Sequence, residues 1–277
     1  MIDETVEEIR EMQTHSSSVV AVKAARALAT LTERDVATVE EYLRDLERNS
    51  SALRRANPSH ASLYTTQRDI VESVTEADPE TLERAKELTV RAVERAVEQV
   101  ETAKHRAAEE GATLLDDGTT ILTHDYSSTV LEAIEIAVQG GAHLTVYVTE
   151  ARPRYLGRKT TRVLAAMDRV DAHLLVDSAS GCVLPECDRV VVGMDCIVGE
   201  TLYNRVGTFP IAATANELDV PVTVVGSRAK IIESGFAFEN EYRSPSEVMR
   251  EPAEGFAIEN PAYDETPVRL VDGVVTD

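Results

Sequence analysis

The 277-residue chain has few cysteines, few lysines and no long apolar run. Three thiols, an odd number in a chain of this length, argue against a disulfide framework and for a reducing compartment; they are Cys182, Cys187 and Cys196. Apolar runs stop well short of the ~20 residues that cross a bilayer, and the N-terminus MIDETVEEIREM is acidic where a secretory signal is basic and then apolar. We therefore expect a soluble, cytoplasmic protein with no membrane partner.

The usual spacings of metal and dinucleotide sites are also missing. The histidines and cysteines form no HxH, HExxH or CxxC arrangement, so the sequence predicts no metal site. The glycine fingerprint GxGxxG does not follow the first expected strand of the second half, so NAD is not expected either. The sequence predicts no cofactor.

Negative charge dominates, with a formal net charge of -21. Arginines greatly outnumber lysines, which are only Lys23, Lys86, Lys104, Lys159 and Lys230. Such a surface repels itself unless concentrated salt screens it, so we expect a halophilic protein from a cytoplasm that holds molar salt. An acidic tract that recruits a basic partner is the alternative, but the even spread of charge favours a solvated surface. No Lys/Arg cluster could neutralise phosphates along a strand, so no direct contact with nucleic acid is expected.

The apolar pattern divides the chain into two parts. Residues 1–110 repeat the three-and-four spacing of helices and predict a helical N-terminal domain; Val36, Val39, Leu43 and Leu46 form one such stripe.

Residues 111–277 predict a Rossmann-like domain that binds a ligand and dimerises. Short apolar runs alternate there with segments long enough for crossover helices, which is typical of a parallel sheet. The expected strands are Thr119 to Leu122, Leu144 to Val148, His173 to Val176, Val190 to Val192 and Val222 to Val225, and the expected helices are Thr129 to Ala137, Arg158 to Met167 and Pro210 to Leu218. From about residue 234 the periodicity fades, and we expect this part to wrap the sheet or a partner subunit. The fold class is α/β, a helical bundle followed by a parallel sheet.

Two stretches, ILTHDYSSTV (121–130) and RVVVGMDCIVGETLYNRVGT (189–208), place polar side chains where buried strands are expected to end. The second puts Asp195 at a strand end and Asn204 and Arg205 a few residues on. Ligands of open α/β sheets bind at that edge. A carboxylate, an amide and a guanidinium there suit a small anionic ligand such as a sugar phosphate.

Four motifs carry a family resemblance: ILTHDYSSTVLEAI, VYVTEARPRYLGRK, LLVDSASGCVLPECDRVVVGMDCIV and LYNRVGTFPIAATA. In this order they resemble the family that unites the alpha, beta and delta regulatory subunits of translation initiation factor 2B with methylthioribose-1-phosphate isomerase and ribose-1,5-bisphosphate isomerase. In motif the chain is closest to the alpha-like members. The same fold hosts catalysts and binding subunits, so the resemblance alone does not decide between them.

The resemblance implies a cysteine and an aspartate as the acid–base pair of the isomerases. Their cysteine stands in a Thr-His-Cys-Asn context, whereas this chain reads Thr123-His124-Asp125-Tyr126. The aspartate is carried over to Asp195. Asp125 could replace the thiol, since two carboxylates facing each other in a dry pocket would keep one of them protonated; alternatively it caps a helix that starts near Ser128.

The resemblance also marks ligand-binding candidates. Arg152, Asn204 and Arg205 match family positions that face the ligand, although surface ion pairing would equally explain the two arginines. His124 would either contact a ligand hydroxyl or be held by backbone partners. The remaining candidates are Tyr126 and Ser127, which match the factor 2B pattern Thr-His-x-Tyr-Ser, and Gly207 and Thr208, at a helix start that binds anions or receives the threonine as a cap.

Two departures weaken the expected phosphate site. The arginine of the isomerases' Arg-Gly-Ala turn is missing where this chain reads His15-Ser16-Ser17-Ser18, and Glu200 would repel a phosphate if it pointed inward.

We therefore expect a regulatory protein similar to factor 2B alpha that binds a sugar phosphate or nucleotide without isomerase activity. The resemblance implies a homodimer or larger homo-oligomer and a translation initiation factor as a further partner. The alternative is an aldose–ketose isomerase acting on a pentose phosphate such as ribose 1,5-bisphosphate, with Asp195 and Asp125 as the catalytic pair. A structural assembly subunit with an empty pocket is a third hypothesis. A cysteine that the fold brought into the cleft opposite Asp195 would restore the family's acid–base pair.

Overall fold

The computed structural model describes residues 2–11, 17–233, 235–251 and 254–277, and it divides into two compact units. The first unit comprises residues 1–103 and 229–238, and the second comprises residues 104–228 and 239–277. The domain boundary expected at residue 110 falls inside the helix Leu82–Ala112. Residues 229–238, which were expected in the second domain, belong to the first unit. No helix in the described ranges combines the length and the apolar character that a membrane span requires.

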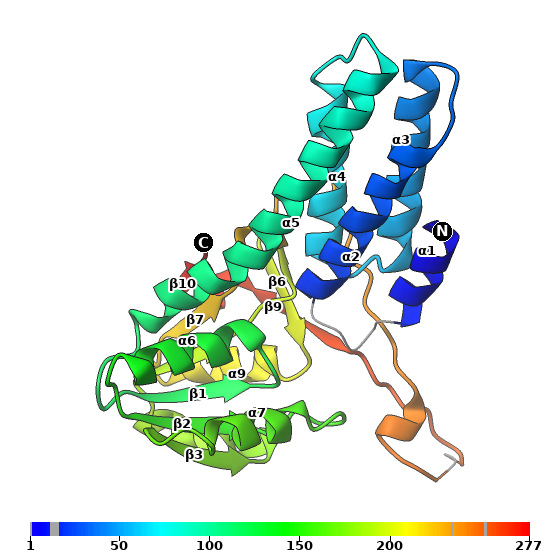
Figure 1. Cartoon of the computed structure of the whole chain (residues 1–277). Helices are drawn as coiled ribbons and strands as arrows, with labels where there is room; N and C mark the ends of the chain where they lie inside the picture. Colours follow the sequence, from blue (N-terminus) through cyan, green and yellow to red (C-terminus); the bar gives the residue numbers. More distant parts are fainter. Residues whose placement is uncertain (1, 12–16, 234, 252–253) are drawn as a thin grey trace. The chain divides into compact units, whose positions relative to one another are not determined.

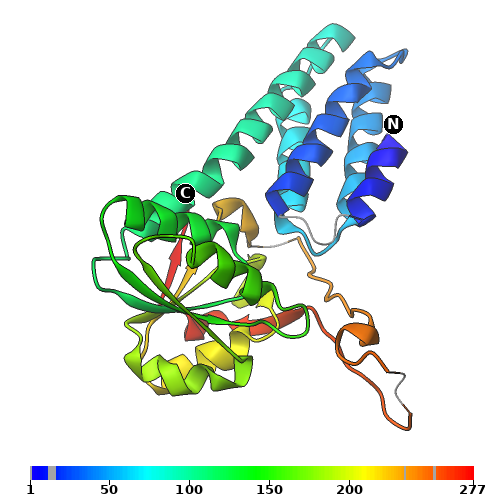
Figure 2. The ribbon, with the colours of Figure 1, turned by 60° about the horizontal axis from the view of Figure 1, so that its bottom comes forward.

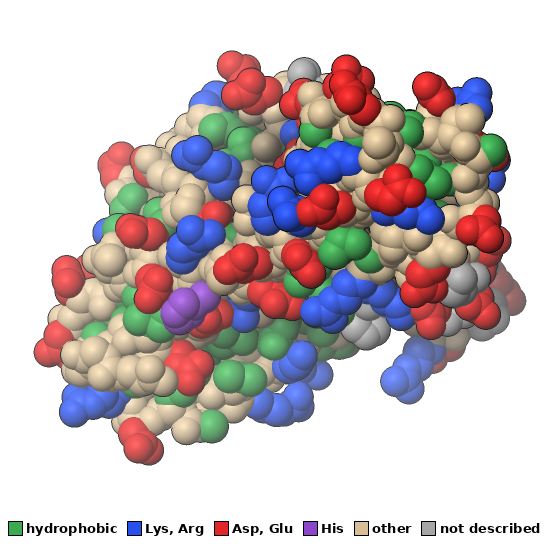
Figure 3. All heavy atoms as spheres, turned by 45° about the horizontal axis from the view of Figure 1, so that its top comes forward, with side chains coloured by type: hydrophobic (Ala, Val, Ile, Leu, Met, Phe, Trp, Pro, Cys, Tyr) green, Lys and Arg blue, Asp and Glu red, His purple; other side chains and the backbone are tan. Residues whose placement is uncertain are grey.

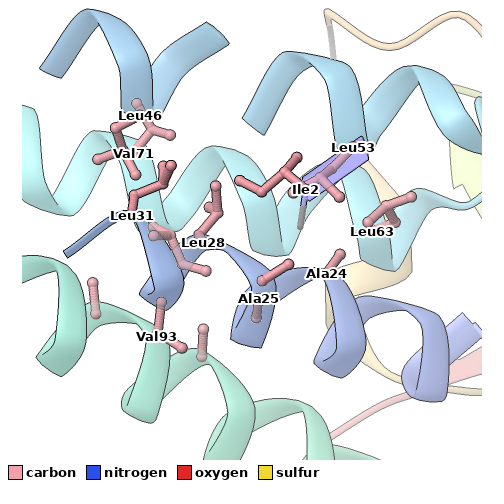
Figure 4. Close-up of a cluster of buried hydrophobic side chains, with 14 of the residues drawn as sticks. Ile2, Ala24, Ala25, Leu28, Leu31, Leu46, Leu53, Leu63, Val71 and Val93 are labelled. Carbon is pink, nitrogen blue, oxygen red and sulfur yellow. The ribbon is translucent and has the colours of Figure 1, made fainter. Parts of the chain in front are cut away.

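The first unit is helical (Figure 1). Its elements are α1 (Ile2–Glu11), α2 (Ser17–Ala29), α3 (Val39–Ala56), α4 (Ala61–Thr75), most of α5 (Leu82–Ala112) and the short strand β8 (Ile231–Ile232). At the start of helix α3, the side chain of Thr38 accepts a hydrogen bond from the Glu41 N–H, while the Glu41 carboxylate accepts one from the Ala37 N–H. Figure 4 shows leucine, valine and alanine side chains of these helices pointing toward one another, with Leu28, Leu31, Leu46 and Leu53 almost fully buried.

The second unit is built on a six-stranded sheet in the order β10-β7-β4-β1-β2-β3, and every pairing in it is parallel. Its strands are β1 (Thr120–His124), β2 (Leu144–Thr149), β3 (Val170–Leu175), β4 (Arg189–Val192), β7 (Val222–Val225) and β10 (Gly273–Val275). The predicted fold class is confirmed, and five of these strands overlap the expected ones. The sixth, β10, comes from the C-terminal part, where no strand was predicted.

Helices cover both faces of the sheet (Figure 2). Apolar side chains of α6 (Ser128–Gln139) and α7 (Leu156–Leu164) share one buried cluster with β1 and β2, through Ile134 and Leu164 among others. Ile211 and Ala215 of α9 (Thr208–Glu217) belong to a second cluster with β4 and β7. A sheet covered on both sides needs apolar residues on both faces of its central strands, which explains why β7 is buried throughout.

A small antiparallel sheet, which the sequence did not predict, follows β4. It pairs β5 (Cys196–Val198) with β6 (Thr201–Arg205), and β6 with β9 (Tyr263–Pro267). The stretch 189–208 is therefore one short parallel strand followed by a hairpin, and Asn204 and Arg205 lie within β6 and not at an edge of the parallel sheet. Buried and less buried residues alternate along β6, as in a strand whose two faces have different surroundings.

Acidic side chains are scattered over the face of the protein that Figure 3 shows. Lys and Arg lie among them there, and several of these basic side chains adjoin one another in the upper part of the view. This distribution agrees with the interpretation of the net charge as a solvated surface.

Candidate active site

Asp125 follows the last residue of β1 directly and takes a left-handed backbone conformation, with φ 61°. Aspartate tolerates this region better than most residues, and the hydroxyl of Thr160 on α7 donates a 2.6 Å hydrogen bond to its carbonyl. The expected alternative, a helix cap, is wrong, since the side chain of Ser127 caps α6 by accepting from the Val130 N–H. The Asp125 carboxylate is thus left for another role.

The carboxylate of Asp125 is buried, with the residue only 6% exposed, and its Oδ1 has no hydrogen-bond partner among the described residues. Burial raises the pKa of Asp125, because a charged carboxylate loses its hydration there, and the neighbouring Asp195 adds to the rise. Arg205, His124 and Arg154 oppose the shift without cancelling it. The protonated form of the Asp125 carboxyl group is therefore more favoured here than in a fully solvated aspartate.

Arg205 connects Asp125 to Asp195. The Arg205 Nε lies 3.7 Å from Oδ2 of Asp125 and 3.5 Å from Oδ2 of Asp195. Asp195 comes three residues after β4, and its backbone N–H donates to the Tyr203 carbonyl at the mouth of the hairpin. Burial alone would lower the pKa of Arg205, but Asp195, Tyr263 and Asp125 raise it, so the guanidinium stays charged. Two carboxylates and one cation therefore form a compact acid–base cluster.

His124 is held by the protein at both ring nitrogens. Nε2 lies 2.8 Å from the Val206 carbonyl, which can only accept, so Nε2 carries a proton, and Nδ1 lies 2.6 Å from the Thr149 hydroxyl. Gly207 lies against this ring, since a Cβ on Gly207 would stand 2.6 Å from Cε1 of the imidazole. Of the two expected roles for His124, the structure shows the one in which protein partners hold the ring.

A pocket opens beside Asp125, and four arginines line it: Arg152, Arg154, Arg205 and Arg243. Its other lining residues are Asp125, Ala151, Pro153, Val206, Asn260, Pro261 and Ala262. The loop after β2 carries Arg152 and Arg154, and the Asp177 carboxylate fixes it by accepting the Ala151 and Arg152 N–H groups, each at 2.7 Å. In a chain of net charge -21 such a concentration of arginine indicates an anion-binding pocket.

Other expected ligand residues contact the protein instead of lining this pocket. The Asn204 amide donates to the Thr208 hydroxyl at 3.1 Å, and that hydroxyl donates to the Arg205 carbonyl at 2.7 Å. The N-terminus of α9 receives the Asp264 carboxylate, whose Oδ2 accepts from the Gly207 N–H at 2.7 Å and from the Phe209 N–H at 3.0 Å. A protein carboxylate thus stands where the sequence allowed a bound anion.

Tyr126 and Ser127 also lie outside the lining. Tyr126 is 36% exposed, and the Lys159 ammonium sits 3.8 Å from the centre of its ring. The Ser127 hydroxyl serves as the cap of α6, and Gly193 packs so closely on it that a Cβ there would stand 2.5 Å from the oxygen. Tyr126 and Ser127 are therefore related to the site only as the two residues that follow Asp125 in the chain.

No cysteine lines the pocket. The Cys187 thiol is buried and donates to the Val183 carbonyl, and burial, followed by Asp188 and Glu186, raises its pKa to about 11. Cys182 is exposed, and Cys196 is buried in β5. The family's thiol is therefore not restored from elsewhere. Within the described ranges, no three His, Cys, Asp or Glu side chains gather as a metal site would require.

The sequence departs from the expected phosphate site at two places, His15 to Ser18 and Glu200. His15 and Ser16 lie outside the described residues. Glu200 is exposed in the turn between β5 and β6 and is absent from the pocket lining, so its charge does not face the arginines.

Sequence reasoning missed Arg154, Arg243 and Asn260. Arg154 is two residues from the expected Arg152, and its position in EARPR was the available signal. Arg243 and Asn260 lie in the C-terminal segment, whose sequence has no periodicity that would place it at the pocket.

The fold and the site define an α/β protein with a Rossmann-like sheet, an N-terminal helical unit and an arginine-lined pocket at the strand ends. The chain belongs to the initiation factor 2 subunit family, whose model matches residues 13–277, as the motifs predicted.

Relatives of known name match over nearly the whole chain. Ribose 1,5-bisphosphate isomerase of Methanocaldococcus jannaschii is 32% identical over 100% of this chain and 90% of its own length, and that of Haloterrigena turkmenica is 31% identical over 99% and 88%. The solved structure of the Pyrococcus horikoshii OT3 translation initiation factor eIF-2B has a TM-score of 0.80 and 28% identity, covering 99% of this chain and 94% of that one.

These names correct one expectation. Six archaeal relatives, at 29% to 32% identity over 99% or more of the chain, are named ribose 1,5-bisphosphate isomerase. The expected regulatory protein without isomerase activity is contradicted, and the isomerase alternative is favoured. That expectation rested on the missing thiol; the chain carries a buried carboxyl group, Asp125, at the position where the resemblance places that thiol.

Proposed function

We propose that this chain is an aldose–ketose isomerase acting on a pentose phosphate such as ribose 1,5-bisphosphate, with Asp125 and Asp195 as the catalytic pair. The observation that carries the proposal is the position of both carboxylates on one guanidinium, that of Arg205, beside an arginine-lined pocket. The six relatives of that name support the choice of substrate.

The reaction requires two groups, each of which donates and accepts a proton in turn, and it requires no external oxidant. Opening the furanose ring breaks the bond between C1 and the ring oxygen, which gains a proton, while C2 loses its proton and a C1–C2 double bond forms. The C2 hydroxyl then loses its proton, C2 becomes a carbonyl, and C1 gains a proton. Both catalytic groups return to their starting states, so an acid and a base within reach of the same sugar are sufficient.

The surroundings of the two carboxylates support different roles for them. Asp125, whose pKa is raised by burial, suits the acid that protonates the ring oxygen and later recovers a proton from the C2 hydroxyl. Asp195 then takes the C2 proton and returns it to C1. Arg205, charged and in contact with both, stabilises the negative charge that develops on the enol oxygen.

The test is turnover on ribose 1,5-bisphosphate and methylthioribose 1-phosphate in molar KCl, followed by NMR. We expect ketose from one of them, and a loss of product in Asp195→Asn. The matched control is Asp168→Asn, which removes an exposed carboxylate outside the pocket and should leave turnover unchanged. Absence of ketose from a panel of pentose phosphates, with the wild-type protein folded, would contradict the proposal.

We also propose that the chain forms a homo-oligomer. Tyr242 and Phe256, in the C-terminal part of the second unit, are 68% and 58% exposed, and a second copy of the chain would cover these large side chains. Light scattering after gel filtration in molar KCl should give a mass of at least two chains; a mass of 30.3 kDa would contradict this.

A further inference from the structure

The four arginines of the pocket differ in the charges that surround them. Arg205 contacts Asp125 and Asp195. Arg243 contacts Glu241 and Glu247, at 2.9 and 2.7 Å. Both of these cations are thus compensated by carboxylates of the protein.

Arg152 and Arg154 have no carboxylate within ion-pair distance in the described part of the chain. Arg152 donates to the Tyr155 hydroxyl and to the Val248 carbonyl, which are both neutral. Arg154 Nη1 is buried and lacks any hydrogen-bond partner among the described residues. A buried guanidinium nitrogen without an acceptor costs free energy, and a protein keeps it where a ligand supplies the acceptor.

The surroundings of Arg154 are unfavourable to its charge. Burial lowers its pKa first, and repulsion from Arg243 and then from Arg205 lowers it further, while the attraction to Asp125 and Glu247 does not compensate. An anion in the pocket would reverse this balance. Two uncompensated guanidinium groups on one loop match the charge of a phosphate dianion, and their forked N–H groups match its oxygens.

We propose that Arg154 binds a phosphate group of the substrate together with Arg152, and that Arg154 makes the pocket selective for a phosphorylated sugar. The inference deepens the proposed function and rests on it. It supplies a phosphate contact from within the second unit, whereas the family's arginine turn near the N-terminus is missing from the sequence.

Thermal melts with and without inorganic phosphate test this without requiring turnover. Wild type and Arg162→Gln, which removes an exposed arginine of α7 outside the pocket, should both gain stability as phosphate is added. Arg154→Gln should melt no lower than wild type without phosphate, since it loses an uncompensated buried charge, and should show no phosphate-linked rise. Arg154→Lys should retain part of the phosphate-linked rise in melting temperature. The Arg154→Gln melt without phosphate also confirms that this variant folds.

Calorimetry with ribose 1,5-bisphosphate gives the second readout. We expect Arg154→Gln to bind roughly ten- to a hundredfold more weakly, as for the loss of charge-assisted hydrogen bonds, with ribose itself bound by neither protein. The inference would be overturned if Arg154→Gln showed the same phosphate-linked rise in melting temperature and the same affinity for ribose 1,5-bisphosphate as wild type. This holds even if the wild type isomerises the sugar. A wild type that lacks turnover but loses phosphate binding through Arg154→Gln would overturn the proposed reaction and leave the phosphate contact standing.

Discussion

The carboxylates of Asp125 and Asp195 approach the same atom, Nε of Arg205, at 3.7 and 3.5 Å. They are far apart in the sequence and come from different elements, one after β1 and one after β4. Because β1 and β4 are parallel neighbours in the sheet, their carboxyl ends meet at one edge, and Arg205 of the following hairpin closes the gap.

Asp125→Cys should retain measurable turnover, whereas Asp125→Asn should lose it. A thiol can give and recover a proton and is the group that the family resemblance places there, but an amide cannot exchange its proton in this way. We expect the Asn variant to lower kcat by roughly 10² to 10⁴, measured by NMR on ribose 1,5-bisphosphate. Asp168→Asn is the control, and an Asp125→Asn protein as active as wild type would remove Asp125 from the mechanism.

Asp125→Asn should also change the pH dependence of stability. The folded-state pKa of Asp125 lies above the ordinary value of 3.8, so the native state holds a proton that the unfolded state releases. This carboxyl group therefore makes the protein less stable as the pH rises from about 3.8 through the raised folded-state value. The Asn variant, which has no proton to lose, should gain in melting temperature relative to wild type across that window. A difference between the two that is constant with pH would contradict the raised pKa.

Gly207→Ala should destabilise the protein far more than Gly141→Ala. Both glycines have similar positive φ values, 111° and 106°, so an alanine suffers comparable backbone strain at either. Only Gly207 also faces the His124 ring, where a Cβ would stand 2.6 Å from Cε1, while nothing lies within 4 Å at Gly141. We expect about 1–3 kcal/mol from backbone strain in each and an additional loss at Gly207 from the displaced imidazole, measured by denaturant unfolding. Equal losses would show that the ring moves freely.

Stability should rise with KCl concentration well beyond about 0.1 M, where the Debye length is already near 10 Å. A net charge of -21 repels itself in the folded state, and salt screens that repulsion. Melting temperatures in increasing KCl measure the effect, with a nonionic solute of equal osmolality as the control. A protein that is most stable at low salt would contradict the halophilic interpretation.

Local pattern explains which parts of the fold were predictable. The alternation of short Val- and Ile-rich runs with helical segments predicted five strands of the parallel sheet, because burial on both faces leaves that pattern in the sequence. The hairpin of β5 and β6 was missed because its strands are only three and five residues long. Strand β10 was missed because three residues at a sheet edge leave almost no periodicity.

The same distinction holds for the site. Asp125, Asp195, Arg152 and Arg205 could be selected from the sequence because each follows a strand or stands in a recognisable motif. The use of Asn204, Gly207 and Thr208 in contacts within the protein depended on Asp264 and on the geometry of β6 and α9, which the motif does not encode.

By itself, the sequence determined the two-part α/β architecture, the family and the place of Asp125 directly after a strand, because periodicity and motif identity are local properties of the chain. Only the tertiary structure decided that Asp125 is buried with a raised pKa, that Arg205 joins it to Asp195, and that Arg154 and Arg243 line one pocket. The physical reason is that desolvation and ion pairing depend on atoms brought together from distant segments, and the energy of a charge is set by those neighbours and not by its position in the chain.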